Sequence, residues 1–207
     1  MSKSICFFFF SAAIVFFGQL AVFSESADLE AKLQEGIKLH DAARIDPEAN
    51  IKKGEGLLSS IQAESPIAKA YYGSIITLEA SEYAKKKDVL KALELLSDGT
   101  KLIDAAVTQS PDIPDIRFLR MENSYEVSQS SPLNRYKAMK QDVDWLDAHK
   151  TQFEAKERGM IELYKGFYYV KAKKIDDALS AFDACIEISP KSKEAVEAQK
   201  QIDRYAE

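Results

Sequence analysis

Two histidines offer the widest choice of chemistry in this sequence, because an imidazole can ligate a metal or move a proton near neutral pH. His40 lies in "KLHDAAR" and His149 in "LDAHK", each near the C-terminus of a different predicted helix. A helical metal site needs two ligands at a spacing such as i and i+4, and His40 with Asp41 or Arg44 does not supply it. A charged imidazole is favoured at a helix C-terminus. Both histidines are therefore interpreted as structural or surface residues, and no metal site is predicted.

Nucleophilic chemistry has little support either. The sequence contains no G-x-S-x-G, no phosphate-binding glycine loop and no H-E-x-x-H. Cys185 lies beside Ile186 and Ile188 on an apolar helix face, which indicates a small buried side chain. The carboxylates of Asp142, Asp144 and Asp147 are interpreted as solvated helix faces. We expect no enzyme, no catalytic residues and no cofactor; an enzyme would require a histidine to meet two carboxylates in a cleft.

Three sets of side chains could instead contact a partner. Tyr71 and Tyr72 are clustered aromatics, for which helix-packing core is the alternative. Arg117, Arg120 and Asn123 in "IRFLRMEN" share one helix face and could hold a carboxylate or an extended backbone, with ion pairing to neighbouring acids as the alternative. The lysines at 85–87 and at 171, 173 and 174 could meet an acidic surface or anionic lipid, or simply complement helix dipoles.

Composition restricts the class of partner. The 207 residues carry 29% charged and 46% hydrophobic side chains, as in an ordinary globular protein. The net charge of −5 excludes nucleic acid as the main partner, because phosphate binding needs a basic face.

The N-terminal residues 1–27 have the order of regions typical of a secretory signal peptide. A short basic start precedes the uncharged residues 5–23, and small residues follow before Asp28. Export to the periplasm with cleavage is expected; an uncleaved inner-membrane anchor through residues 5–23 is the alternative. Cys6 falls in this segment, so Cys185 would have no disulfide partner in the mature chain.

From Asp28 onward, apolar residues recur with helical spacing, and pairs such as Asp46–Pro47 and Ser65–Pro66 indicate helix starts. The predicted helices span 28–45, 47–63, 67–86, 88–109, 114–128, 133–149, 152–172, 175–188 and 191–206.

One stretch, "YKGFYYVKAKKIDDALSAFDACIEISP", combines small and aromatic residues at fixed intervals. Gly166, Tyr169, Ala178, Phe182, Cys185 and Pro190 follow the order G-x2-Y…A-x3-F…P. The stretch resembles a tetratricopeptide repeat, although Glu162 and Lys165 stand where an aromatic and a leucine are usual. The resemblance implies that first helices line a concave face, and it assigns Leu163, Phe167, Val170 and Lys171 to that face.

Weaker matches to the same pattern extend the resemblance over residues 28–207. The segments before Pro66 and Pro111 end like the one before Pro190, and Gly73 is expected to correspond to Gly166, in an elongated hairpin. The expected fold is all-α, a right-handed stack of about four antiparallel helix pairs with a C-terminal capping helix. Such a divergent, exported bacterial member is expected to hold a protein or peptide partner in a groove, with peripheral membrane or envelope-complex association as a further option. The alternative is a periplasmic accessory of a transporter or envelope assembly that binds a small ligand in an apolar cavity.

Overall fold

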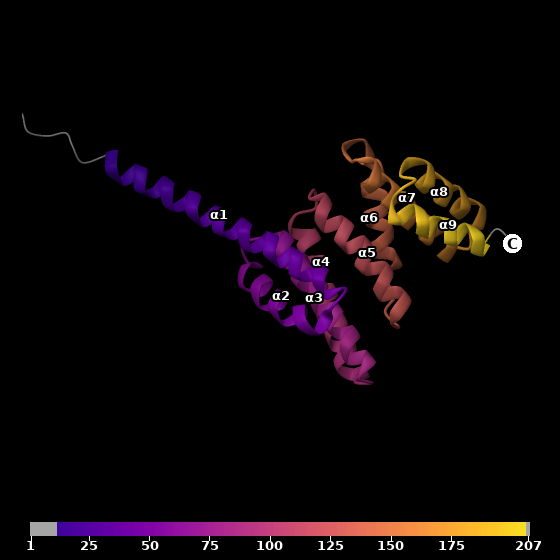
Figure 1. Ribbon diagram of the computed structural model, residues 1–207, viewed down its shortest axis with the longest axis horizontal. Helices are drawn as coiled ribbons and strands as arrows, with labels where there is room; N and C mark the ends of the chain where they lie inside the picture. The colour runs from indigo at the N-terminus through magenta and orange to yellow at the C-terminus, as the bar shows by residue number, and fades with distance from the viewer. Residues whose placement is uncertain (1–11, 206–207) are drawn as a thin grey trace, which may run out of the picture.

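The computed structural model describes residues 12–205, and for residues 12–25 it describes the backbone path alone. This part of the chain contains nine α-helices, one 3-10 turn and no strand, which confirms the all-α prediction. Figure 1 shows α1 as a long rod that leads into the other helices, which follow one another along the molecule to α9. The helices are α1 Ala12–Ala43, α2 Pro47–Ile61, α3 Pro66–Lys85, α4 Val89–Gln109, α5 Pro114–Ser130, α6 Tyr136–Ala148, α7 Ala155–Lys171, α8 Ile175–Ile188 and α9 Lys193–Tyr205, with η1 at Lys150–Gln152.

The expected signal peptide, residues 1–27, and the alternative anchor, residues 5–23, lie almost entirely before residue 26, where the described side chains begin. Within the part of the chain that is described, no helix is both long enough and apolar enough to cross a bilayer.

Proline marks helix starts where a side chain caps the exposed backbone. Asp46 and Ser65 each accept a hydrogen bond from the backbone N–H three residues on, ahead of Pro47 and Pro66. The predicted start of the last helix at 191 is two residues early, because Ser192, and not Ser189, accepts the capping bond from Ala195 N–H.

Two other predicted starts also move toward the C-terminus. The sixth helix begins at Tyr136 rather than 133, after a turn in which the Asn134 side chain accepts from Tyr136 N–H. The seventh begins at Ala155 rather than 152, because Glu154 and Glu157 form a capping box there.

Consecutive helices pack as neighbours: α1 with α2, α3 with α4, α5 with α6, α7 with α8, and α9 against α8. The odd-numbered helices also contact one another along the chain, α1 with α3, α3 with α5, and α7 with α9. Between α5 and α7 the rings of Tyr125 and Phe167 stack with centroids 4.2 Å apart. The odd-numbered helices thus form one continuous layer.

Glycine permits the closest approach between α3 and α4. A methyl group added to Gly73 would lie 2.5 Å from the carbonyl oxygen of Gly99, and one added to Gly99 would lie 2.5 Å from that of Gly73. The two backbones therefore touch at this point. At Gly166 the neighbour is instead the ring of Phe182, which is fully buried together with Ala178.

The correspondence of Gly73 with Gly166 is wrong. The turns after α3 and α7 have the same backbone form, with Lys87 (φ 64°) and Lys173 (φ 59°) in the left-handed region. Counting from these turns, Ala80 and Ala92 take the places of Gly166 and Ala178, at the same 12-residue separation, and all four are buried. The hairpin is elongated, as predicted, because α3 and α4 have 20 and 21 residues where α7 and α8 have 17 and 14.

Candidate functional site

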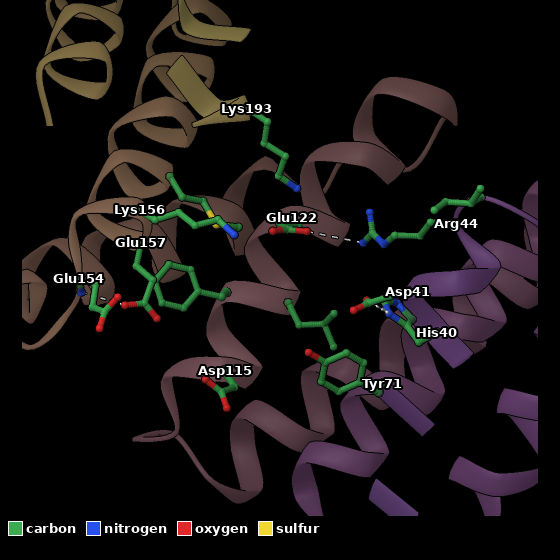
Figure 2. Close-up of a pocket in the computed structure, with 14 residues that line it drawn as sticks. His40, Asp41, Arg44, Tyr71, Asp115, Glu122, Glu154, Lys156, Glu157 and Lys193 are labelled. Carbon is green, nitrogen blue, oxygen red and sulfur yellow. Dashed lines mark hydrogen bonds and ion pairs between the residues drawn. The ribbon is translucent and has the colours of Figure 1, made fainter. Parts of the chain in front are cut away.

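Two adjoining hollows, of about 790 and 450 Å³, lie on the layer of odd-numbered helices. They share Arg44, Glu122, Met160 and Lys193, so they form one continuous groove. Its walls come from the C-terminal end of α1, from α3, α5 and α7, and from α9. Figure 2 shows side chains from these helices converging on the larger hollow.

Arg44 crosses the groove where the two hollows meet. It lies directly after α1, and its guanidinium reaches α5, with Nη1 2.8 Å from Glu126 Oε1 and Nη2 3.6 Å from Glu122 Oε2 (Figure 2). Glu122 and Glu126 are one helical turn apart, so both carboxylates face α1. Burial raises the pKa of Glu122, and the positive charge of Arg44 only partly opposes that effect.

Acidic side chains outnumber basic ones along the groove. The two hollows are lined by eight carboxylates and four cations, so an excess of four negative charges faces the groove. The acids are Asp41, Asp115, Glu122, Glu126, Glu154, Glu157, Glu194 and Glu197, and the cations are Arg44, Lys156, Lys193 and Lys200. This balance favours a cationic ligand.

Apolar side chains lie between these charges and at the rim. Ile45 is 89% exposed in the larger hollow and Val196 is 58% exposed in the smaller one. Met160 contributes to both hollows. Burial raises the pKa of Tyr71 to about 12, so its phenol stays protonated near neutral pH and can donate a hydrogen bond.

Glu194 on α9 carries an unpaired carboxylate oxygen. The residue is only 4% exposed, and its Oε2 has no hydrogen-bond partner among the described atoms. Its Oε1 lies 3.8 Å from the Nζ of Lys193, a loose contact. A buried carboxylate without full pairing is costly, so a positive group in the smaller hollow would stabilise it.

His40 lies at the base of the larger hollow. Its hydrogen bonds link Asp41, His40 and Ser74 in an order that resembles a Ser-His-Asp catalytic triad. Its Nδ1 lies 3.1 Å from Asp41 Oδ1, and its Nε2 lies 2.9 Å from Ser74 Oγ. The hydrogen bond from His40 lowers the pKa of Asp41 below its usual value. Ser74, however, is fully buried in the middle of α3, where the backbone N–H groups are used by the helix and cannot form an oxyanion hole. The chain of bonds therefore holds α1 against α3 rather than activating a nucleophile.

The predicted basic set on α5 is buried and bonded within the protein. Arg117 and Arg120 are 9% and 8% exposed, and both bind Asp142 of α6, at 3.0 Å for Arg117 and 2.6 and 2.8 Å for Arg120. Asn123 is 2% exposed and donates to Thr77. The interpretation of Asp142 as a solvated residue is wrong: it is fully buried, because two guanidinium groups pair with it.

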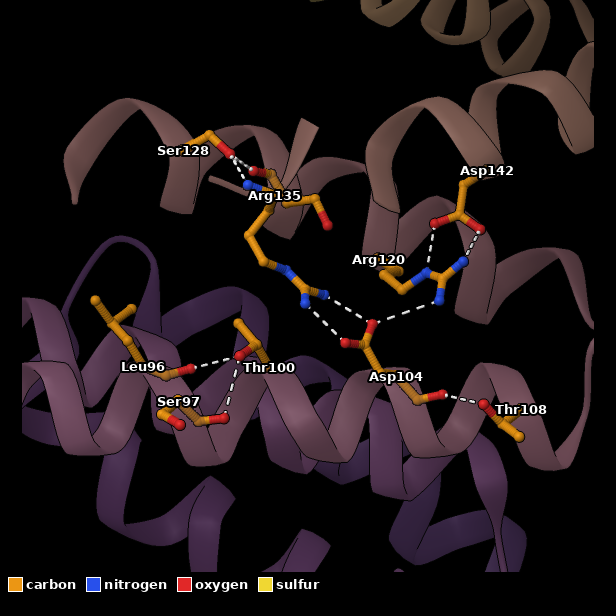
Figure 3. A network of polar contacts seen from close by, with 10 residues as sticks. Leu96, Ser97, Thr100, Asp104, Thr108, Arg120, Ser128, Arg135 and Asp142 are labelled. Carbon is orange, nitrogen blue, oxygen red and sulfur yellow. Dashed lines mark hydrogen bonds and ion pairs between the residues drawn. The ribbon is translucent and has the colours of Figure 1, made fainter. Parts of the chain in front are cut away.

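The same network joins three helices. Asp104 of α4 binds Arg135, which precedes α6, through two contacts of 2.7 Å, and it also accepts from Arg120 at 3.4 Å. Figure 3 shows Arg120 between Asp104 and Asp142. Ion pairs therefore hold α4, α5 and α6 together.

The remaining predicted partner-binding residues are divided between the groove and other places. Tyr71 and Leu163 line the groove. Tyr72 packs half-buried against the N-terminal core, and Phe167 is 7% exposed between Tyr125 and Phe182. Val170 is half-buried in the C-terminal core, whereas Lys171 is exposed and lies 5.0 Å from the ring of Tyr136 on α6.

Most of the groove residues were not singled out in the sequence, among them Arg44, Glu122 and Glu194. The i, i+4 pair of Glu122 and Glu126 was a visible signal for a charged face on one helix. Nothing in the sequence indicates that Arg44 lies opposite it.

The described residues give no support for a metal site, a reactive thiol or a catalytic role of His149. Among the described residues, no three His, Cys, Asp or Glu side chains are placed to hold a metal ion. Cys185 is buried, as predicted, and burial raises its pKa to about 11. His149 stacks on Trp145 with ring centroids 4.0 Å apart, and its Nδ1 lies 2.7 Å from the Trp145 carbonyl oxygen, which makes it a structural residue.

Comparison with models of protein families, with curated proteins and with solved structures gave no match. The function proposed below therefore rests on the chemistry of the groove.

Proposed function

We propose that this protein is an exported, non-enzymatic binding or scaffold protein with a tetratricopeptide-like right-handed stack of helix pairs, and that it holds a basic segment of a protein partner in the groove. The observation that carries the proposal is the groove on the odd-numbered helices, with four more acids than bases and an unpaired buried oxygen on Glu194. Concave surfaces of helical-repeat proteins commonly serve such a purpose.

The shape of the groove favours a peptide over an enclosed small molecule. Its rim includes Ile45 at 89% exposure and the side chain of Lys193 at 82%, so solvent reaches it along its length. An open groove with a charged rim suits an extended or helical segment, whereas a small ligand is usually enclosed by apolar walls. The mixture of acidic and apolar side chains in the groove fits a segment that carries both Lys or Arg and apolar residues.

A defined probe tests this charge preference. Fluorescence anisotropy is measured with a labelled nine-residue peptide of alternating Lys and Leu, and with its Glu and Leu counterpart. We expect the basic peptide to bind and the acidic one to fail. The variant Glu194→Gln/Glu197→Gln should weaken binding of the basic peptide about tenfold, because two attractive charges on α9 are lost.

The control removes the same charge from the other layer of helices. Asp183 and Glu187 are exposed on α8, and Asp183→Asn/Glu187→Gln should leave the affinity unchanged. Equal weakening by both double variants would mean that the peptide responds to net charge alone, which would contradict a groove site.

The native partner can be sought by photo-crosslinking from two groove positions, Ile45 and Val196, and from two exposed positions outside it, Lys101 and Asp183. A protein that is captured from both groove positions and from neither control supports the proposal. Retention of a small molecule by the purified protein, displaced by the basic peptide, would favour the alternative of a periplasmic small-ligand accessory.

A further inference from the structure

The turn between α3 and α4 projects from the helices that surround it. All seven residues from 84 to 90 are exposed. In Figure 1 this turn is the lowest point of the molecule, beyond the ends of α2 and α5. Its surface is therefore free of cover from neighbouring helices.

The tip of this hairpin combines exposed apolar side chains with positive charge. Val89 is 59% exposed and Leu90 is 84% exposed. The two are half of the four large hydrophobic residues that are strongly exposed in the described chain, the others being Ile45 and Val196 of the groove. Lysines occupy 85, 86, 87 and 91, so residues 84–91 carry a net charge of +3, with Asp88 the one acid, on a chain whose net charge is −5. Lys85 and Lys91 form ion pairs with Glu82 and Glu94 of the flanking helices, whereas Lys86 and Lys87 have no acidic partner among the described residues.

The α7–α8 turn provides an internal comparison. It has the same backbone form, with Lys173 in place of Lys87, and it also carries three lysines. At the positions of Val89, Leu90 and Lys91, however, it has Ile175, which is half-buried, and the acids Asp176 and Asp177. The turn geometry thus does not require an exposed apolar pair flanked by lysine, and the α3–α4 tip has a surface of its own.

We propose that the α3–α4 tip docks on an anionic lipid bilayer. Val89 and Leu90 enter the headgroup region, where apolar side chains leave water, and the flanking lysines lie against acidic headgroups. An exposed apolar patch ringed by basic residues has the two components that peripheral membrane binding requires, because neither component suffices alone. The acidic groove is separate from this tip, so the two proposals stand or fall independently.

Hydrogen–deuterium exchange measures the protection of the tip amides directly. The full chain is mixed with vesicles of phosphatidylglycerol and phosphatidylcholine. We expect the amides of residues 84–91 to be protected by anionic vesicles, and those of 171–177 to exchange as they do without lipid. Because the readout is local, membrane attachment through any other segment does not mimic it. Vesicles of phosphatidylcholine alone should give no protection.

Two variants separate the contribution of the lysines from that of the apolar pair Val89 and Leu90. The first variant, Lys85→Gln/Lys86→Gln/Lys87→Gln, should raise the lipid concentration needed for half-protection about 100-fold. Each lysine near an anionic surface contributes about 1 kcal/mol, which corresponds to about a fivefold change in affinity. Val89→Ser/Leu90→Ser should raise that lipid concentration about tenfold. The control Lys171→Gln/Lys173→Gln/Lys174→Gln removes equal charge from the other turn and should change nothing.

Any of three results with vesicles would overturn the proposal: no protection of 84–91 by anionic vesicles, equal protection by neutral vesicles, or equal loss in the 171–174 control. Protection by soluble polyglutamate at the same concentration of negative charge would also overturn it, since the tip would then be a site for an acidic protein.

Discussion

Replacing Asp142 by Asn should destabilise the protein more than any other single charge neutralisation on α6. Asp142 is fully buried, and its two oxygens accept three bonds of 2.6 to 3.0 Å from Arg117 and Arg120. Removing one partner of a buried ion pair typically costs about 3–5 kcal/mol, because the opposite charge stays buried without compensation. Arg117 keeps a 2.6 Å bond to the Pro111 carbonyl oxygen, so the lower end, about 3 kcal/mol, is expected.

The assay is urea unfolding followed by far-ultraviolet circular dichroism, with the midpoint and slope compared between variants. Asp144, two residues away on the same helix, is the matched control: its side chain is 60% exposed and pairs with Lys140, so Asp144→Asn should cost about 0.5 kcal/mol or less.

A loss below about 1 kcal/mol in Asp142→Asn would refute the view that this carboxylate holds α5 to α6. The triple variant Asp142→Leu/Arg117→Met/Arg120→Met separates charge from packing. It should recover most of the stability, because an apolar replacement leaves no buried charge unpaired.

Four further outcomes follow from the structure. Gly73→Ala should cost about 1–3 kcal/mol in urea unfolding, because the new methyl group meets the α4 backbone, whereas Gly56→Ala, with open space around it, should stabilise by up to about 1 kcal/mol. Phe182→Ala should cost about 3–5 kcal/mol in the same assay, through a cavity against Gly166. Cys185, with its pKa raised by burial to about 11, should react with a thiol reagent at pH 8 only after denaturant is added, as followed by peptide mapping. Burial raises the pKa of Glu122 above its unfolded value, so protonation favours the folded state, and the wild type should gain melting temperature relative to Glu122→Gln as the pH falls from 7 through that pKa.

The helices were predictable from sequence because their signals are local. The spacing of apolar residues and the pairs Asp46–Pro47 and Ser65–Pro66 act within one or two turns of a helix. The observed helices match the predicted ranges to within a few residues, except that α1 begins at Ala12 and not at 28. Starts were misplaced where the capping residue is not followed by a proline, as at Glu154 and Ser192, because several neighbouring polar residues can serve as the N-cap.

The candidate site was much less predictable, because it depends on contacts between distant segments. Arg117, Arg120 and Asp142 all look like surface charges in a linear sequence, and only the packing of α5 on α6 buries them together. Arg44 and Glu126 are 82 residues apart, and their contact at 2.8 Å requires three helix pairs to be in place. Tyr71 and Leu163 were selected as aromatic and first-helix residues, and these two do line the groove.

The two hairpin turns show why the fold is easier to predict than the ligand. Ala80 and Ala92 in one hairpin, and Gly166 and Ala178 in the other, are small because a larger side chain would separate the helices, whatever the protein binds. No such requirement applies at the exposed positions of the same turns. Leu90 and Asp176 therefore occupy equivalent places with opposite chemistry, and each can change without cost to the hairpin. In this chain the packing positions determine the architecture, and the two surfaces proposed to meet partners, the groove and the α3–α4 tip, include exposed positions that packing leaves free to vary.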